Sequence, residues 1–219
     1  MIFIAFFVRI ILSLAEMILL NVFTDWFRAQ NPLEVIGVIT GILCVYLAAK
    51  NIIWNWPFAI ISVAVYIIIF FEAKLYADMG LQFYFLAMNI YGWYFWSRKP
   101  KTEAKVPVIR ITRKEMILSV IGIILFTGIL GFLLKQGTDA AFPFIDSFCT
   151  ACSLIAQVFL ARKVLENWLI WVFVDVIYVI VYAYKQLHLT AGMYALYFII
   201  AALGYRDWKR DYQLQKSVS

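Results

Sequence analysis

The stretch NWPFAIISVAVYIIIFFEAKLYADMGLQFYFLAMNIYGWYFW, residues 55 to 96, has a counterpart in NWLIWVFVDVIYVIVYAYKQLHLTAGMYALYFIIAALGYRDW, residues 167 to 208. A shift of 112 positions superimposes the two without a gap, and it pairs an opening Asn-Trp, two glycines and a closing tryptophan. The matched block extends outward to about 34 to 96 and 146 to 208, although its overall identity is low. An internal repeat of this kind constrains the whole fold. The sequence therefore predicts two copies of one structural unit.

The composition of the chain is that of a membrane protein. Hydrophobic residues make up 65% of the 219 residues, charged residues only 15%, and the mean hydropathy is +0.87. Soluble domains are about half apolar and about a quarter charged. The net charge is +6, but the basic residues gather at the ends of apolar runs, which is a topology signal rather than a nucleic-acid footprint. We expect the lipid bilayer as the surrounding medium and no nucleic-acid partner.

Apolar segments separated by short polar breaks follow one another along the chain. Helices are expected, because backbone groups in lipid must be satisfied within the segment and the alternation typical of barrel strands is absent. The segments run approximately from 2 to 23, 33 to 49, 52 to 71, 79 to 96, 115 to 134, 145 to 161, 167 to 184 and 190 to 205.

Three of these segments fall in each repeat, and one lies between the repeats. Equivalent helices are therefore four helices apart, and an even shift preserves their direction. This predicts an all-α membrane protein with two parallel three-helix bundles joined by a linker helix (3+1+3), plus an N-terminal helix, and a ligand site between the bundles. The expected divisions are an N-terminal helix at 1–28, a first bundle at 33–96, a basic loop at 97–114, a linker helix at 115–134, a second bundle at 145–208 and a tail at 209–219.

The N-terminal segment allows three interpretations. Arg9 and Glu16 are seven residues apart and share one helical face. The segment is thus an interfacial helix, an additional packed span, or a span whose charges face protein. It has no basic leader and no cleavage site of small residues, so we expect no removed signal peptide.

The distribution of basic residues predicts the orientation. The loop at 97–114 is the most basic one and is expected in the cytoplasm by the positive-inside rule. Counting spans from it places Lys50, Arg162 and the tail on the same side. We expect a multi-pass protein of the bacterial inner membrane with a cytoplasmic C-terminus.

Residue patterns typical of enzymes are absent. Cys44, Cys149 and Cys152 lie within apolar runs, and the Cys-x-x-Cys pair has no second pair of ligands that would indicate zinc. The single histidine, His188, falls in a short loop, and no glycine-rich phosphate loop follows a strand. The sequence predicts neither catalysis nor a cofactor.

One helical face within 167 to 184 is aromatic and polar. Trp171, Asp175 and Tyr178 recur at steps of four and three. An aspartate deep in a bilayer costs about 2.5–3.5 kcal/mol, so its retention indicates a use. An acid between aromatic rings suits a flat, cationic ring. The alternative is a packing seam between helices, with Trp168 and Lys185 as interface anchors.

Amides on two other segments are further candidates for ligand contacts. Gln157 lies on one of them, and the other carries Gln82, Asn89 and Trp93 on one face; an unpaired amide at membrane depth bonds another helix or a ligand. Asp175, Asn89 and Gln157 have apolar repeat counterparts, which favours an asymmetric ligand. Trp96 and Trp208 are interpreted as tryptophans of the membrane–water interface. Tyr194 completes the candidate site.

Four strings together resemble one family. NIYGWYFWSR (89–98), FPFIDS (142–147), ARKVLENWLIW (161–171) and GYRDW (204–208) are similar to the PnuC nicotinamide riboside transporters, over about 32–210. The resemblance implies a SWEET-like fold and facilitated diffusion of nicotinamide riboside, the vitamin B3 form that is a precursor of NAD. It also implies trapping of the substrate by a cytoplasmic riboside kinase, without ion coupling or an ATP site. Homo-oligomers such as trimers occur in the family.

The polar faces and the resemblance together suggest hypothetical roles for six of the eight candidates. Trp171 and Tyr178 flank the ring, Asp175 supplies negative potential or a gate hydrogen bond, and the amides of Gln157, Asn89 and Gln82 reach the ribose or the carboxamide. Three alternatives stay open: transport of thiamine or another nucleoside-like compound, proton coupling through Asp175, and a membrane scaffold or sensor whose polar faces serve packing alone.

Overall fold

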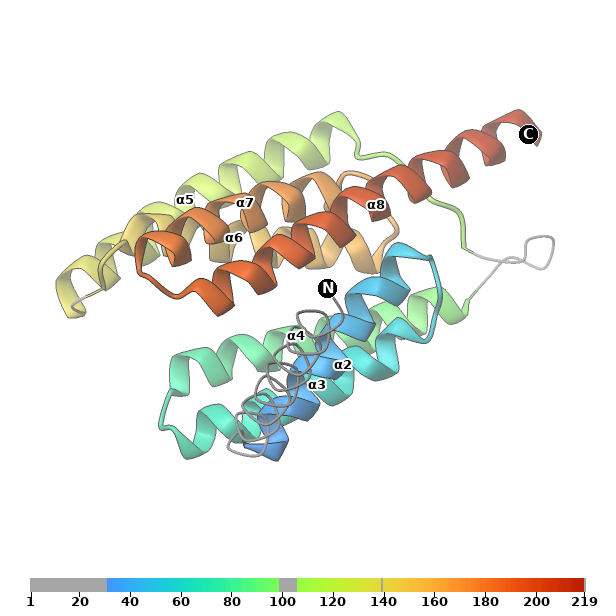
Figure 1. Cartoon of the computed structure of the whole chain (residues 1–219). Coiled ribbons are helices and arrows are strands. Elements are labelled where there is room, and N and C mark those ends of the chain that lie inside the picture. Colours follow the sequence, from blue (N-terminus) through green and yellow to red (C-terminus); the bar gives the residue numbers. More distant parts are fainter. Residues whose placement is uncertain (1–30, 99–105, 139, 219) are drawn as a thin grey trace, which may run out of the picture.

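A computed structural model describes residues 31–98, 106–138 and 140–218. The expected N-terminal helix at 1–28, and the part of the basic loop at 99–105, lie outside the described residues. The helices, shown in Figure 1, are α2 (Pro32–Ala49), α3 (Asn55–Glu72), α4 (Tyr76–Ser97), α5 (Arg113–Gly137), α6 (Pro143–Ala161), α7 (Asn167–Tyr184) and α8 (His188–Val218).

The described helices form the predicted all-α membrane fold. Helices α2, α3, α5, α6 and α7 are long and apolar enough to cross a membrane. Helices α4 and α8 are not among these five. Helix α4 carries Asp78, Gln82 and Asn89, and α8 does not end at 208 but continues to Val218. Both lie in the same bundles as the more apolar helices (Figure 1).

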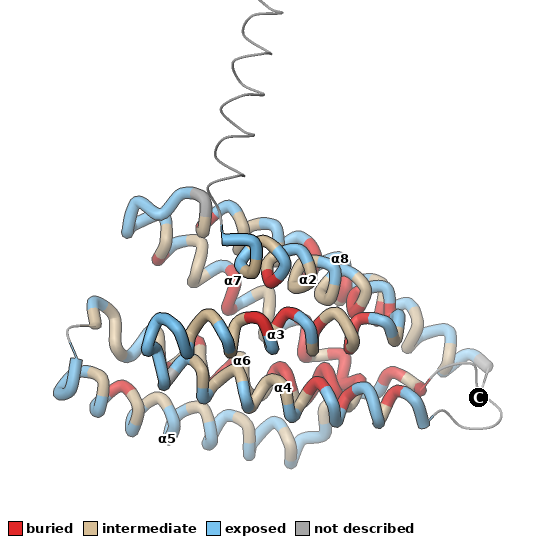
Figure 2. Tube along the Cα trace, turned by 90° about the horizontal axis from the view of Figure 1, so that it is seen from below, coloured by how far each residue is buried: buried red, intermediate tan, exposed pale blue. Residues whose placement is uncertain are grey.

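The two bundles join into a closed ring of six helices. In the first bundle α3 contacts both α2 and α4, and in the second bundle α7 contacts both α6 and α8. The ring is closed by contacts of α2 with α8 and of α4 with α6. The linker helix α5 packs against α6 outside the ring. Figure 2 shows that many of the buried residues lie between the helices of this ring.

The internal repeat is visible in the backbone. In the described part of the chain, four non-glycine residues have a left-handed φ. They form two pairs of repeat-equivalent positions: Asn51 (56°) with Lys163 (57°), and Lys74 (59°) with Gln186 (60°). Each lies just after a helix, and the N–H of the residue that follows it donates to a carbonyl in the last turn of that helix. For example, the Ile52 N–H donates to the Leu47 carbonyl at 2.9 Å. These are Schellman-type caps. The same turn therefore ends α2 and α6, and likewise α3 and α7.

The paired glycines allow a tryptophan to approach a neighbouring helix closely. A Cβ at Gly92 of α4 would lie 2.3 Å from Cη2 of Trp56 on α3. The equivalent Cβ at Gly204 of α8 would lie 2.9 Å from Cδ2 of Trp168 on α7. Both tryptophans are only 1% exposed. The rare residues of the repeat thus define a helix contact that occurs once in each bundle.

The sequence suggested that Trp96 and Trp208 lie at the membrane–water interface. In the structure both are core residues. Trp208 is fully buried and Trp96 is 5% exposed. Their rings lie 5.7 Å apart, and each meets the tryptophan of its own bundle edge to face, Trp56 at 5.2 Å and Trp168 at 5.5 Å. Trp168, considered as an anchor, belongs to the same cluster. A sequence position near a span end does not distinguish lipid from an interface between bundles.

We call the end of the ring that holds this cluster the basic end; it lies at the right of Figure 1. It contains the α2–α3 turn (50–54), the α6–α7 turn (162–166) and the last part of α8. Lys50 pairs with Asp207 at 2.8 Å, and this hydrogen bond lowers the pKa of the Asp207 carboxyl. Arg162 pairs with Glu115 at 2.7 Å.

A short segment fastens the α6–α7 turn at the basic end. Ile109 pairs with the turn as an isolated β-bridge, in which its N–H donates to Lys163 O and its carbonyl accepts from Leu165 N. The Ile111 N–H donates to Glu166 Oε2 at 2.9 Å, and Arg110 pairs with the same carboxylate. We call residues 106–111 the strap. Nothing comparable is found among the described contacts of the α2–α3 turn.

Candidate substrate site

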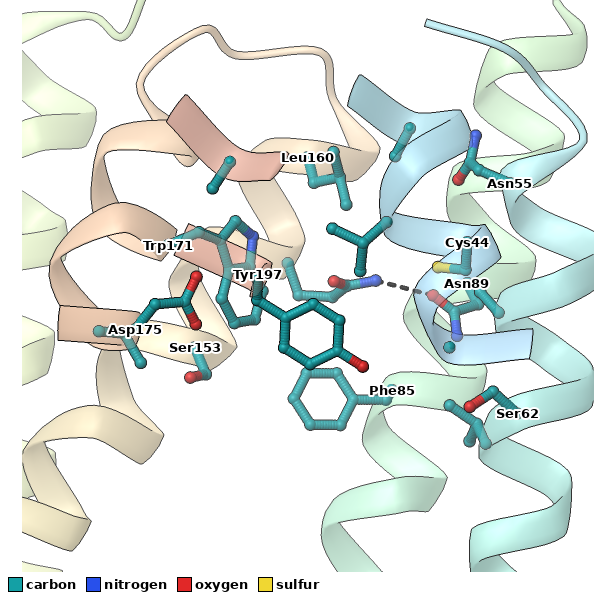
Figure 3. A pocket seen from close by; sticks show the side chains of 18 of the residues that line it. Cys44, Asn55, Ser62, Phe85, Asn89, Ser153, Leu160, Trp171, Asp175 and Tyr197 are labelled. Atoms are coloured by element: carbon teal, nitrogen blue, oxygen red, sulfur yellow. Dashed lines mark hydrogen bonds between the residues drawn. The ribbon is translucent and has the colours of Figure 1, made fainter. Parts of the chain in front are cut away.

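A cavity of about 390 Å³ lies inside the ring. All six helices of the ring contribute lining residues, whereas α5 contributes none. The volume is within the range of about 300–1,000 Å³ that is usual for small-molecule sites. The site that the sequence predicted between the bundles thus corresponds to a cavity between them (Figure 3).

The structure brings seven of the eight candidate residues together around this cavity. Trp93 is the exception: it is 43% exposed and does not line the cavity. Its neighbour Gly92 packs on Trp56 inside the bundle, and the next helical position lies about 100° further round the axis. The lining candidates are Gln82, Asn89, Gln157, Trp171, Asp175, Tyr178 and Tyr194.

Asp175 is the one acidic residue among those that line the cavity, and no Lys, Arg or His lines it. It lies on α7, where it is 4% exposed, and Trp171 lies one turn before it on the same side of the cavity (Figure 3). No hydrogen bond or ion pair of Asp175 occurs with any of the described residues. A buried acid without a partner is costly unless a ligand, water or a proton satisfies it.

Asn89 and Gln157 contact each other across the two bundles. The Nε2 of Gln157 on α6 donates to Oδ1 of Asn89 on α4 at 2.7 Å (Figure 3). The two residues are 7% and 3% exposed, Gln157 being the more exposed. Each primary amide has more donors and acceptors than this bond uses. The pair can therefore hold the bundles together and still offer polar atoms to a ligand.

Tyrosines form a second group of lining residues. The rings of Tyr178 and Tyr194 lie 4.7 Å apart, and Tyr194 also meets Tyr197 at 6.1 Å. Sequence reasoning missed Tyr197, Tyr66 and Phe85, all of which line the cavity. The repeat contained a signal for Tyr66, which is equivalent to the candidate Tyr178, but none for Phe85 and Tyr197, which are equivalent only to each other.

Several buried polar atoms at the cavity have no hydrogen-bond partner among the described residues. They are Oδ1 of Asn55, Nε1 of Trp56 and Nε1 of Trp168, on residues that line the cavity. In contrast, the hydroxyls of Thr150 and Ser153 donate to carbonyls of their own helix. Buried polar groups are almost always paired, so these atoms are further candidates for contact with a polar ligand. No group of metal-ligating side chains occurs in the described part of the chain.

A cavity enclosed by a two-fold ring of membrane helices is the architecture of a carrier. Its lining combines aromatic faces, amides and one acid, which suits a flat polar molecule and provides no nucleophile paired with a base. Residues 31–210 match the model of a family described as nicotinamide mononucleotide transporter. The chain belongs to this family of membrane transporters and is not an enzyme.

Individual relatives agree with this assignment. The chain is 32% identical to the nicotinamide riboside transporter PnuC of Escherichia coli K12, over 84% of this chain and 94% of that protein. It is 25% identical to the riboflavin/roseoflavin transporter RibM of Streptomyces davaonensis, over 80% and 83% of the two chains. The crystal structure of the vitamin B3 transporter PnuC matches the fold with a TM-score of 0.68 at 24% identity, and the match covers 89% and 87% of the two chains.

Proposed function

We propose that this protein transports nicotinamide riboside across the bacterial inner membrane. The observation that supports this substrate most strongly is the charge of the cavity. Asp175 lines it, and no basic residue does. The nicotinamide ring of the riboside is flat and cationic, and its sugar carries no charge. Such a ligand supplies the positive partner that Asp175 does not find among the described residues.

The same charge distribution disfavours the phosphorylated mononucleotide. A phosphate carries about 1.5 to 2 negative charges at neutral pH and is usually held by Arg, Lys or a helix N-terminus. Inside this cavity it would face the Asp175 carboxylate without a cationic partner. Between the two nicotinamide compounds that relatives and family are named for, the riboside fits the lining better.

The lining residues divide into ring-binding and sugar-binding groups. Trp171 and Tyr178 flank the nicotinamide ring on α7, with Asp175 between them along the helix. Tyr194 extends the aromatic wall beside Tyr178. The amides of Gln82, Asn89 and Gln157 hydrogen-bond the ribose hydroxyls or the carboxamide. Trp93 has no part in this arrangement.

Transport proceeds by facilitated diffusion with alternating access of the cavity to the two sides. Asp175 has no basic partner that would form a proton relay within the described residues. The basic end faces the cytoplasm, in accord with the positive-inside rule, and the C-terminus lies on that side. A cytoplasmic riboside kinase then adds a phosphate, which prevents return because the cavity disfavours the phosphorylated product. The protein assembles as a homotrimer.

Riboflavin is a second candidate substrate, because a relative that matches four fifths of the chain is named for its transport. Thiamine is a third, because it is also a flat cation. Riboflavin carries no positive ring, so Asp175 would give it no electrostatic advantage. The charge of the ligand therefore separates these candidates in an experiment.

The test is titration of the purified protein with nicotinamide riboside, its mononucleotide, thiamine and riboflavin, followed by uptake into proteoliposomes. We expect the riboside to bind most tightly and to be taken up without an ion gradient. The variant Trp171→Ala should weaken its binding, whereas Tyr184→Ala, an aromatic that is 76% exposed on the same helix, should not. Tightest binding of another compound reassigns the substrate, and binding of none favours a scaffold.

A further inference from the structure

Two pairs of repeat-equivalent positions touch each other at the basic end. Nζ of Lys163 donates to Oδ1 of Asn51 at 2.5 Å, and these residues occupy the same position in the α6–α7 and α2–α3 turns. The equivalent Trp96 and Trp208 lie 5.7 Å apart. In a molecule with two-fold pseudosymmetry, equivalent positions meet only at the axis. Both contacts therefore lie where the axis leaves the cavity at the basic end.

Further hydrogen bonds join the bundles around these two pairs. Nε1 of Trp96 donates to the Ala161 carbonyl at 3.1 Å, and Nε1 of Trp208 donates to the Ala48 carbonyl at 3.0 Å. Asn51 also donates to Asp211 of α8 at 3.0 Å. The cavity begins directly beneath this layer, since Ala48 lines it. The layer therefore lies between the cavity and the basic end.

No such layer is found among the described residues at the opposite end of the ring. Besides the basic-end contacts, the hydrogen bonds between the bundles in the described residues are those of Asn89 with Gln157 and of the Tyr84 hydroxyl with the Leu154 carbonyl at 2.9 Å. Both lie along the length of α4 and α6, level with the cavity. The described contacts therefore hold the bundles together chiefly at one end.

Lys163 is the unusual member of the layer at the basic end. Its side chain is only 2% exposed, and its ammonium lies 4.1 Å from the centroid of the Trp96 ring. Burial of an ammonium is costly unless hydrogen bonds and aromatic faces compensate it. The contacts with Asn51 and Trp96 of the first bundle contribute to this compensation. They are made only while the two bundles are together at the basic end.

We propose that Lys163, with Asn51 and the Trp96–Trp208 pair, forms a gate that must separate for a substrate to leave the cavity toward the basic end. This inference rests on the proposed transport function. The strap fastens the turn that carries Lys163 to the second half of the chain. The turn that carries Asn51 has no strap among its described contacts, and its Trp54 is 64% exposed. The first bundle is the part that moves when the gate opens.

Cys44 provides a reporter for the gate, because it lines the cavity in the first bundle. In protein with Cys149→Ala and Cys152→Ala, its rate of reaction with a membrane-impermeant maleimide is measured from each side in oriented vesicles. We expect Lys163→Met to increase labelling from the basic end about tenfold, because removal of a buried contact shifts a two-state equilibrium. Methionine keeps the length of the side chain and has no branched Cβ.

The matched control is Arg162→Met, which removes the neighbouring cation. Arg162 pairs with Glu115 and not with the first bundle, so labelling of Cys44 should stay unchanged. Riboside binding by each variant reports whether the cavity is intact. Unchanged labelling from the basic end in Lys163→Met, or an equal increase in Arg162→Met, overturns the proposal. The labelling requires no substrate, so failure of the proposed transport activity is distinguished from failure of the gate.

A second variant tests the gate by locking it shut. The native cysteines are removed by Cys44→Ala, Cys149→Ala and Cys152→Ala, and Asn51→Cys and Lys163→Cys introduce a new pair. A bifunctional methanethiosulfonate joins the two new cysteines, and dithiothreitol removes the link. We expect the joined protein to bind substrate from the opposite end but not to transport it, and the reductant to restore transport. Full transport by the joined protein contradicts the gate. Cross-linking Arg162→Cys to Glu115→Cys in the same background should leave transport intact.

Discussion

The two bundles share their helix contacts and differ in the side chains that face the cavity. Positions that build the closest helix contacts keep their residue, as Trp56 and Trp168 do against Gly92 and Gly204. The turns keep their backbone conformation but not their residues. Most positions that face the cavity have diverged, although Tyr66 and Tyr178 are both tyrosine. At four pairs the first bundle has a small or apolar residue and the second a larger or polar one: Gly41 and Ser153, Val45 and Gln157, Ala59 and Trp171, and Val63 and Asp175. At Asn89 and Ala201, and at Ser62 and Val174, the polar residue belongs to the first bundle.

This difference shows that the scaffold and the ligand site are separately encoded. A duplicated helix contact must be conserved in shape, since interiors are close-packed and a single added methyl group is felt. A side chain that faces the cavity has no close-packed neighbour there. One bundle can therefore acquire an acid and an indole at positions where the other bundle stays apolar. An asymmetric cavity in a symmetric scaffold suits a ligand with a ring at one end and a sugar at the other.

The largest effect is expected where the shared scaffold is broken. Gly92→Ala places a methyl group 2.3 Å from the buried Trp56 ring, whereas Gly204→Ala places one 2.9 Å from Trp168. Overpacking costs about 1–3 kcal/mol and occasionally more. We expect Gly92→Ala to abolish the folded, monodisperse protein on size-exclusion chromatography and Gly204→Ala to lower its melting temperature. A melting temperature equal to wild type in both would mean that the close contacts do not define the bundles.

The acid that distinguishes the second bundle should dominate binding. Asp175→Asn keeps the shape of the side chain but removes its charge, and we expect riboside affinity to fall about tenfold or more because a cationic ligand loses its counter-ion. Calorimetric titration measures the change. Asp78→Asn, an exposed acid in the first turn of α4, is the control. If both variants bind as wild type does, the electrostatic argument for a cationic substrate fails.

Smaller effects are expected when the amide pair is replaced by its repeat counterparts. Asn89→Ala and Gln157→Val introduce the residues found at positions 201 and 45, and each leaves the other amide without its 2.7 Å partner. We expect each to weaken binding by about three- to tenfold with folding retained, and the double variant to lose less than the product of the two, because neighbours that share a bond are not additive. Strictly multiplicative losses would show that the two amides act independently.

The smallest expected effect tests the duplicated turns. Lys74→Gly and Gln186→Gly relieve a left-handed φ of 59° and 60° at two exposed positions. Glycine adopts this conformation without a Cβ clash, so each should raise stability by up to about 1 kcal/mol. Equal increases in melting temperature would confirm equivalent turns. A decrease in only one of the two would show that this turn depends on its side chain.

The 112-residue shift sufficed to predict the parallel bundles, the linker helix between them and the inward position of most candidate residues. Helical periodicity placed Asp175 and Trp171 on one face correctly. The same periodicity misplaced Trp93, because the direction of a face at the end of a helix depends on which neighbour it meets. It also missed Tyr66, Tyr197 and Phe85, since an aromatic residue in a membrane helix has the same local pattern whether it faces lipid or a cavity.

The sequence by itself determined the membrane class, the helical fold and the duplication, because hydropathy and residue spacing are local properties of the chain. Only the tertiary structure decided that the two bundles close into a ring, that Trp96 and Trp208 are a core instead of a lipid interface, and that Lys163 meets its own repeat counterpart. These features arise from contacts between residues far apart in the chain, 112 positions for Asn51 with Lys163 and 68 positions for Asn89 with Gln157. No local pattern specifies which of two apolar surfaces a helix turns toward its neighbour.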